Sequence, residues 1–354
     1  MTATTYNYGW ESLAEWGVGT PTNDSAFGTA VTPDETFAYL KSATITANAN
    51  TIPYWVVGSA QYRKVAKFIK GQFTTTANLT FNMANDMDAT CLDAWILKMP
   101  FDAFNVAHSG TAWVVPNTGT SAYGSNVLPG FTLEIGHNST TPKVQILAGC
   151  AVDRCSIRAR AGEPIEFSMD LISKTATFDN AAYSAGSVTA STSPPLTWGD
   201  YTAYYADDGT QSARTTMTEW EVTIANNLVP NYDLSSSATM EFNRMICGNQ
   251  ELTGSFTVDM STTAGTAFYD ALCNDASAPF INTTVVDEKE TELLMGAAAA
   301  SWDLRFRKIC LPEVPLDIDP SKIQAITIGW TGQYYSATLN TTDTASITNW
   351  DDQD

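Results

Sequence analysis

The chain has 354 residues, a length that favours two domains of ordinary size. Hydrophobic residues make up 44% of it, enough for buried cores, whereas charged residues make up only 16% and leave a net charge of −20. This balance excludes a protein that grips nucleic acid through a basic face, because affinity for phosphate comes mainly from Lys and Arg.

The N-terminal region, residues 1–35, is predicted to be an arm. It is rich in Gly, Thr and Pro and carries scattered apolar side chains such as Trp16, Phe27 and Val31, so it cannot form a core alone and needs another surface. It lacks the basic and apolar regions of a signal peptide, and the longest apolar run, 293–302, is too short to cross a bilayer. We therefore expect a protein made in a cytoplasm, with no membrane partner.

Alternation of apolar and polar residues is the strongest local signal, and it predicts a mainly β chain. The pattern occurs in FTLEI (131–135), IEFSMDLI (165–172), EWEVTI (219–224) and WDLRFR (302–307). A period of two residues is typical of antiparallel strands with one buried face and one wet face.

Two segments break this alternation and are predicted to be short helices. Residues 86–99 begin with acidic residues and place apolar side chains at helical spacing. Residues 263–273 repeat the same stripe in the second half of the chain. Each helix is expected to pack on a sheet.

A stretch of the first half recurs in the second half. KFIKGQFTTTANLTFNM (67–83) matches RMICGNQELTGSFTVDM (244–260) without a gap, at an offset of half the chain length. Two further pairs stand at this half-chain offset, Pro53 with Pro230 and Asn50 with Asn227. We interpret this pattern as an internal duplication.

The duplication divides the chain into modules. The offset is expected to shorten slightly after the helices, so that FTLEI matches WDLRF (302–306) and IEFSMDLI matches YYSATLNT (334–341). The predicted parts are an arm (1–35), module 1 (36–178), an Ala/Ser/Thr/Pro-rich linker (179–195), module 2 (196–348) and an acidic tail (349–354).

No catalytic constellation is visible. There are only two histidines, His108 and His137, and no P-loop, GxGxxG, GxSxG or HExxH motif. The six cysteines lack metal-binding spacing and are expected to be buried thiols. Arg154, Arg158 and Arg160 share strand parity, and we expect them to form inter-strand or inter-subunit ion pairs. The sequence therefore predicts no enzyme, no cofactor and no metal.

Several segments resemble the tail tube proteins of long-tailed phages and related archaeal viruses, in the branch with a duplicated tube module. EWGVGTPTNDSAFGTAVTP (15–33) is similar to the arm of that family, and FTLEIGH…KTATF (131–178) follows its hairpin-and-strand pattern. PLTWGDYTAYYADDG (195–209) and WEVTIANNLVPNYDLSS (220–236) resemble the start of its second module, and 244–260 resembles its Gly-marked strand. The first copy departs from that strand pattern, because Ala77 stands where the second copy has Gly254.

The resemblance implies a virion structural protein. Two tandem β-sandwich or half-barrel modules, each with one short α-helix on the outside, would close into a ring-shaped β-barrel on oligomerisation. Three chains would complete a pseudo-sixfold ring, and stacked rings would form a tail tube that conducts viral DNA without binding it. The implied partners are other copies, a tape measure protein and tail terminator or tip proteins. The implied location is the virion tail, after assembly in the host cytoplasm.

This resemblance gives roles to two groups of residues. Trp16, Phe27 and Val31 of the arm are expected to contact the next ring, so that deletion of residues 1–35 leaves rings that do not stack. Acids on the wet strand faces are expected to line the lumen, where like charge repels DNA. These acids are Glu134, Glu166, Asp170, Glu219, Glu221 and Asp259.

Two other functions fit parts of the sequence. A β-sandwich receptor-binding, glycan-binding or tail-tip protein would use Trp113, Trp198 and Tyr204 in an aromatic cleft. A carboxylate-based glycosidase would need paired acids in a pocket, whereas the sequence offers acids on strand faces.

Overall fold

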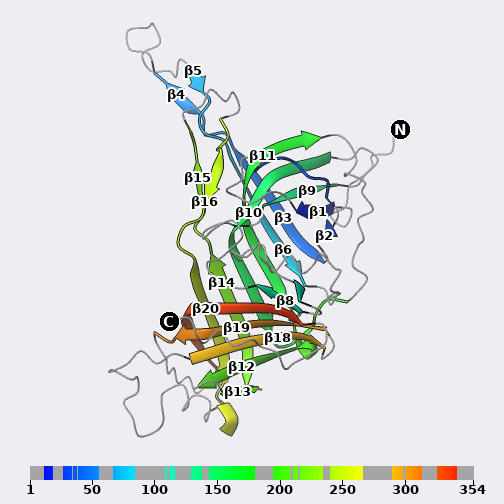
Figure 1. Cartoon of the computed structure of the whole chain (residues 1–354), viewed down its shortest axis with the longest axis vertical. Helices are drawn as coiled ribbons and strands as arrows, with labels where there is room; N and C mark the ends of the chain where they lie inside the picture. The colour runs from blue at the N-terminus through cyan, green and yellow to red at the C-terminus, as the bar shows by residue number, and fades with distance from the viewer. Residues whose placement is uncertain are drawn as a thin grey trace, which may run out of the picture.

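The computed structural model confirms a mainly β chain (Figure 1). It describes residues 12–18, 27–33, 35–37, 39–55, 67–83, 108–109, 112–115, 128, 130–137, 143–179, 194–207, 210–213, 216–233, 240–265, 289–297, 300–312 and 325–340. Sixteen of the described strands form one sheet, and two short hairpins form sheets of their own.

The first half of the chain supplies eleven of the described strands. They are β1 (Ser12–Val18), β2 (Glu35–Thr36), β3 (Leu40–Asn48), β4 (Ile52–Tyr54), β5 (Lys67–Ile69), β6 (Thr74–Asn82), β7 (His108–Ser109), β8 (Ala112–Val115), β9 (Phe131–His137), β10 (Lys143–Arg160) and β11 (Glu166–Asp179).

The second half supplies the other nine described strands and a short 3-10 helix. They are η2 (Trp198–Asp200), β12 (Tyr201–Asp207), β13 (Thr210–Ala213), β14 (Met217–Ala225), β15 (Val229–Asn231), β16 (Arg244–Ile246), β17 (Glu251–Asp259), β18 (Lys289–Ala297), β19 (Ala300–Cys310) and β20 (Ala325–Asn340).

The large sheet contains the same pairing order twice. The first set runs β3-β6-β11-β10-β9-β1, and the second set runs β14-β17-β20-β19-β18-β12, with antiparallel neighbours throughout. The sets are joined where β14 pairs with the second half of β10, from Arg154↔Ala225 to Arg160↔Glu219. The described strands form no closed barrel within one chain.

At the start of the two strand sets, the bounds of corresponding strands match residue by residue. The bounds of β3, β4, β5 and β6 recur, at the half-chain offset, as those of β14, β15, β16 and β17. Even an irregularity recurs, because the β3–β6 ladder shifts register between Leu40 and Ser42, and the β14–β17 ladder shifts between Met217 and Glu219. The offset found in the sequence is therefore also an offset in structure.

Of the two expected matches farther along the chain, the first is wrong, and the second is right in its strands but wrong in its register. FTLEI lies in β9, which occupies the place of β18 in the pairing order, whereas WDLRF lies in β19, which occupies the place of β10. β11 does correspond to β20, but to its first part rather than to YYSATLNT, because Leu171 pairs with Ala77 and Trp330 pairs with Gly254. Alternation alone could not distinguish these strands, since every one of them alternates.

Two glycines explain how each strand set turns into its hairpin. Asn50 and Asn227 both have positive φ, 34° and 49°. A Cβ on Gly71 would lie 2.0 Å from the carbonyl oxygen of Asn50, and one on Gly248 would lie 2.6 Å from that of Asn227. Glycine is required at both places because two chain segments approach closely.

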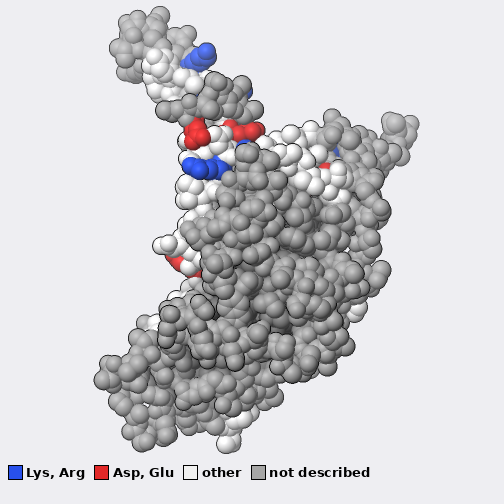
Figure 2. Space-filling model, in the orientation of Figure 1, with Lys and Arg blue, Asp and Glu red and all other residues white. Residues whose placement is uncertain are grey.

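The β4–β5 hairpin extends from one end of the body along the longest axis, and the β15–β16 hairpin lies at the base of this projection (Figure 1). In Figure 2 the described atoms of this projection are mostly white, and red and blue charged atoms gather where it meets the body. A projection of this kind cannot bury its own side chains, since each hairpin has only three residues in each strand.

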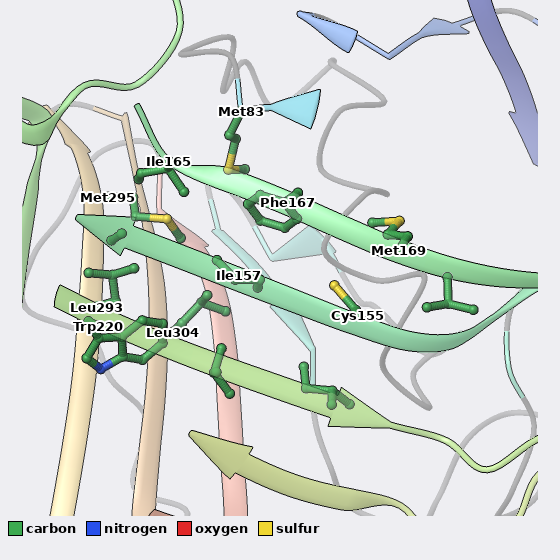
Figure 3. Close-up of a cluster of buried hydrophobic side chains, with 14 of the residues drawn as sticks. Met83, Cys155, Ile157, Ile165, Phe167, Met169, Trp220, Leu293, Met295 and Leu304 are labelled. Atoms are coloured by element: carbon green, nitrogen blue, oxygen red, sulfur yellow. The ribbon is translucent and has the colours of Figure 1, made fainter. Parts of the chain in front are cut away.

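The main core lies between facing layers of the folded sheet. Figure 3 shows Ile157 of β10, Phe167 of β11 and Trp220 of β14 pointing toward Leu293 of β18 and Leu304 of β19. Burial alternates along β14, along residues 166–173 of β11 and along residues 154–160 of β10, as half-buried strands require, whereas residues 147–152 of β10 are buried throughout. One continuous core therefore spans both strand sets.

A smaller second core lies at the base of the projection. It contains Phe27, Leu128 and Ala151 from the first half of the chain and Leu228, Phe242 and Met245 from the second half. The rings of Phe27 and Phe242 lie 6.4 Å apart. This cluster fixes the β15–β16 hairpin against the first strand set.

The two predicted helices lie mainly outside the described residues. Residues 86–99 are not described at all. Residues 263–265 are helical, where the second helix was predicted to begin, and the residues after them are not described.

The predicted arm is partly built into the fold. β1 pairs with β9 from Ser12↔His137 to Val18↔Phe131, and Ala14 is buried in the main core. Phe27 is 1% exposed, and its carbonyl oxygen accepts a hydrogen bond of 2.6 Å from Lys174 Nζ. The apolar arm does need another surface, as predicted, but β1 and Phe27 find that surface in their own chain.

Candidate functional site: a polar sheet face and two projecting hairpins

One face of the large sheet carries polar side chains across seven neighbouring strands, β3, β6, β11, β10, β14, β17 and β20. We call it the polar face. Five of the six predicted lumen acids lie on it, because residues opposite each other in antiparallel ladders point to the same side. These five are Glu166 and Asp170 of β11, Glu219 and Glu221 of β14, and Asp259 of β17.

Glu134 is the exception, and the expectation of a wet face is wrong for its strand. Glu134 is 2% exposed, and Thr132 on the same side of β9 is 1% exposed. The reason lies in the N-terminal segment, since the backbone N–H of Val31 donates a 2.9 Å hydrogen bond to Thr132 Oγ1. That segment therefore contacts the side of β9 that alternation assigned to water.

Cross-strand ion pairs neutralise much of the charge on the polar face. Glu219 accepts hydrogen bonds from Arg158 Nε at 2.5 Å and from Arg160 Nη2 at 3.1 Å. Burial opposes the charged form of Glu219, but these hydrogen bonds and the two positive charges outweigh it and hold its pKa below the ordinary value. The expected inter-strand ion pairs are thus confirmed for Arg158 and Arg160.

Other acids of the polar face also have partners. Glu166 forms a salt bridge with Lys41 of β3, and Asp170 accepts a 2.7 Å hydrogen bond from Asn78 Nδ2 of β6. Asp259 accepts a 2.8 Å hydrogen bond from the backbone N–H of Ser261, and hydrogen bonds from the Ser261 side chain and backbone lower its pKa. The face therefore mixes paired charges rather than presenting a uniformly acidic surface.

A row of hydroxyl groups crosses the polar face at one level. Each of the seven strands contributes one Ser or Thr, and each is the direct register partner of the next. The row consists of Ser42, Thr80, Ser168, Ser156, Thr223, Thr253 and Thr331. It is an uncharged band between levels that carry Arg and carboxylate groups.

The projecting hairpins carry exposed apolar side chains. Ile52 and Ile69 are direct partners across β4–β5 and are 53% and 43% exposed. Their counterparts across β15–β16, Val229 and Ile246, are 56% and 48% exposed. The same hairpin face is thus apolar and uncovered at both places, a pattern that marks interaction surfaces.

The three predicted arm contacts have different surroundings. Phe27 is buried within the chain, so it has no surface left for a neighbouring ring. Val31 is 38% exposed and its contact with a neighbour stays a prediction. Trp16 pairs with Leu133 and Glu35 through the backbone, and its side chain lies outside the described residues.

The aromatic residues proposed for glycan binding are not brought together. Trp113 lies in β8, which pairs with β20, and Tyr204 lies in β12, so β20, β19 and β18 stand between their strands. Four strand spacings correspond to roughly 19 Å along a sheet. Trp198 is 61% exposed on η2, next to β12.

The described residues contain neither a metal-binding cluster nor a membrane-spanning helix. Within them, no group of three or more His, Cys, Asp or Glu side chains could hold a metal ion. No helix in the described ranges is long and apolar enough to cross a bilayer.

Sequence reasoning missed the hairpins as surfaces. The sequence analysis assigned no role to Ile52, Ile69, Val229 or Ile246, because an apolar residue in a strand is usually buried. A signal was present, since the first two match the last two at the half-chain offset, beside the repeated Pro and Asn residues. What the sequence could not show is that such short strands leave the body of the protein.

Comparison with known proteins supplies the family. A comparison with curated protein sequences finds no match. The family model described as "Phage tail tube protein" matches residues 2–332, nearly the whole chain. This chain therefore belongs to the phage tail tube protein family.

Proposed function

We propose that this protein is the major tail tube subunit of a tailed virus and that its copies polymerise into stacked rings that conduct DNA. One observation carries the proposal beyond the family match: the chain contains the same strand order twice, joined edge to edge by β10 and β14. We interpret the two strand sets as tandem copies of one tube module. A chain that already joins two modules in this way holds the template for joining further copies.

The free edge of the first strand set supports this template. Among the described strands, β3 pairs with β6 alone and ends the sheet. Its counterpart β14 has a second partner, the latter half of β10. An unpaired edge strand is an open template for another strand. In the proposed ring, β3 of one copy continues the sheet of the next copy beyond the end of β19, as β14 lies beside β10 within the chain.

Closure of the ring follows from repetition of this joint. Every copy adds two modules, so three copies give six modules in a pseudo-sixfold arrangement. Closing the sheet removes its edges and places one face inside and one outside. The main core already occupies one side of the sheet, so the polar face becomes the wall of the channel.

The composition of the polar face suits passage of DNA. Five acids line it, and Arg158 and Arg160 are held by Glu219, so these cations are not offered to phosphates. The hydroxyl row adds a level without charge. Viral DNA would therefore pass without specific binding, within a virion tail assembled in the host cytoplasm.

The hairpins provide contacts between rings. They project from one end of the subunit, and Ile52, Ile69, Val229 and Ile246 expose apolar area there that water solvates poorly. Burial of this area against the next ring would drive stacking. Tape measure and tail terminator or tip proteins would meet the ends of such a tube.

Negative-stain electron microscopy and native mass spectrometry of the purified protein test the proposal. We expect rings or tubes and a ring mass of three chains. Monomers alone, at high concentration and across salt conditions, would overturn it. Ile246→Asp should give rings that do not stack, whereas Val31→Asp tests the arm prediction separately.

A receptor- or glycan-binding role is the alternative from another class. It rests on Trp113, Trp198 and Tyr204, which the fold separates, so no specific observation favours it. Glycan binding without self-assembly would reverse this ranking.

A further inference from the structure

The two projecting hairpins differ on one face. The face that carries Ile52 and Ile69, or Val229 and Ile246, is exposed in both copies. On the opposite face, Phe68 of β5 is 64% exposed, whereas its counterpart at the half-chain offset, Met245 of β16, is 3% exposed. The equivalent position is therefore open in the first strand set and covered in the second.

The residue after β4 repeats this difference. Trp55 is 56% exposed, whereas its counterpart Tyr232 packs on the second core, with its ring 6.0 Å from that of Phe242. Its hydroxyl also lies within hydrogen-bond distance of the Phe73 carbonyl oxygen, at 3.1 Å. Two large aromatic side chains of the first set thus stand in water where their counterparts are packed.

The cover on Met245 comes from the preceding module. Met245 belongs to the second core together with Ala151 of β10 and Leu128, both from the first half of the chain. Ala151 lies just before the part of β10 that pairs with β14. The module before a hairpin therefore covers its inner face, and the β4–β5 hairpin has no preceding module in its own chain.

Register identifies the residue that would do the same in the next copy. Ala151 pairs with Ile172, which pairs with Thr76. In the second set, Cys310 pairs with Thr331, which pairs with Thr253, the counterpart of Thr76. Cys310 thus holds the place of Ala151. Ala151 is fully buried, but Cys310 is only partly buried and ends the described part of β19.

We propose that the Trp55–Phe68 face of the β4–β5 hairpin is a side-to-side contact within the ring, covered by the Cys310 end of β19 from the neighbouring copy. This inference rests on the proposed function, because it uses the same joint between modules. It assigns the two faces of the hairpin to different partners: the Ile52–Ile69 face to the next ring, and the Trp55–Phe68 face to the neighbour in the same ring.

Cross-linking between isotopically distinct copies tests this contact. Phe68→Cys protein is prepared in light and 15N-labelled forms, mixed before assembly, and treated with a short bis-maleimide. We expect a cross-link between positions 68 and 310 that joins light and heavy chains in rings. The matched control is Ile69→Cys, on the opposite face of the same strand, which should give no product with Cys310. Adding Cys310→Ala to Phe68→Cys should abolish the product.

A measurement on the wild-type chain keeps the test independent of the variant. Cys310 is partly exposed in the single chain, so a single maleimide reagent should label it there. On assembly its labelling rate should fall by roughly tenfold or more, because a covered thiol is shielded from reagent.

The outcomes separate this inference from the proposed function. Rings in which Phe68→Cys gives no 68–310 product and Cys310 keeps its labelling rate would overturn the lateral contact while leaving the tube intact. If Phe68→Cys fails to assemble, the labelling rate of Cys310 in wild-type rings decides alone. Absence of any assembly by the wild-type chain would overturn the proposed function, and this inference with it.

Discussion

The contact between Gly254 and Trp330 predicts a reversible packing conflict. Trp330 is 2% exposed and lies in an aromatic cluster, with its ring 5.3 Å from Phe306 and 6.5 Å from Trp220. A Cβ on Gly254 would lie 2.2 Å from Trp330 Cζ2 and 2.5 Å from the Glu221 carbonyl oxygen. Neither neighbour can yield easily, since one is packed and the other is backbone. Gly254→Ala should therefore lower the free energy of unfolding by about 3 kcal/mol, the upper part of the range for overpacked cores.

The first strand set shows how the conflict is relieved. There Leu171 occupies the place of Trp330, and Ala77 occupies the place of Gly254. Trp330→Leu alone should cost about 2–4 kcal/mol, because it leaves a cavity. The double variant should be more stable than the sum of the two single effects predicts, with a coupling of about 1–3 kcal/mol.

Urea unfolding, followed by far-UV circular dichroism, gives the free energy of unfolding of the wild type, the two single variants and the double variant. Gly329→Ala is the matched control, because a Cβ there would have its nearest contact at 3.9 Å, and its effect should be small. The reasoning is refuted if Gly254→Ala is as stable as wild type. It is also refuted if the two substitutions are additive.

The remaining predictions concern charge, the N-terminal segment and the thiols. Glu219→Gln should cost about 1 kcal/mol or less at neutral pH. Because the pKa of Glu219 is lowered in the folded chain, this loss should shrink as pH falls through that pKa, and an equal loss in acid and at neutrality in urea titrations would contradict it. Phe27→Ala should lower the free energy of unfolding by about 3–5 kcal/mol, whereas Val31→Ser, at an exposed position, should lower it little. Calorimetry compares the two variants. A similar loss of stability in both would refute a core role for Phe27. Cys310 should react with maleimide much faster than Cys150 and Cys155, the two buried thiols of β10, because burial raises the pKa of Cys150 to about 12 and also raises that of Cys155. Mass spectrometry of labelled peptides measures these rates. Equal rates would contradict the burial of the two β10 thiols.

The expectation for deletion of the N-terminal region changes with the fold. Removal of residues 1–35 was expected to leave folded rings that do not stack. It would also remove β1 from the edge of β9 and Phe27 from the second core. Loss of stability is therefore the first expected result, and an effect on stacking is better tested by Val31→Asp in the full chain.

The sequence predicted the strands well where repetition and alternation agreed. The half-chain offset alone placed β6 and β17 in the same register, and Gly71 and Gly248 marked the turns before them. Beyond that stretch, the matching failed because pairing is a long-range property. Nothing local in FTLEI shows whether its strand takes the same place in the pairing order as the strand formed by WDLRF, or the neighbouring place.

Burial was the second limit of the sequence. Glu134 stands in an alternating strand and looked solvated, but the N-terminal segment, which is distant in the sequence, covers that side of β9. Phe27 looked like an intermolecular contact because its own segment offers no core, and the partner is in the same chain. Conversely, nothing in the sequence marked the apolar hairpin residues as exposed. In each case the deciding contact lies far away in the sequence.

The long strand β10 has a consequence for the order of events during synthesis. The first half of β10 pairs with β9, which is synthesised before it, and the second half pairs with β14, which is synthesised later. The second half therefore lacks this partner until β14 has left the ribosome. Until then the chain carries an open strand edge whose natural partner has a near-equivalent, β3, in every other copy. A prematurely terminated chain would keep that edge for good and could capture the β3 of a finished subunit. If rings grow through this joint, as proposed, incomplete chains would interfere with assembly, and rapid completion of each subunit would be favoured.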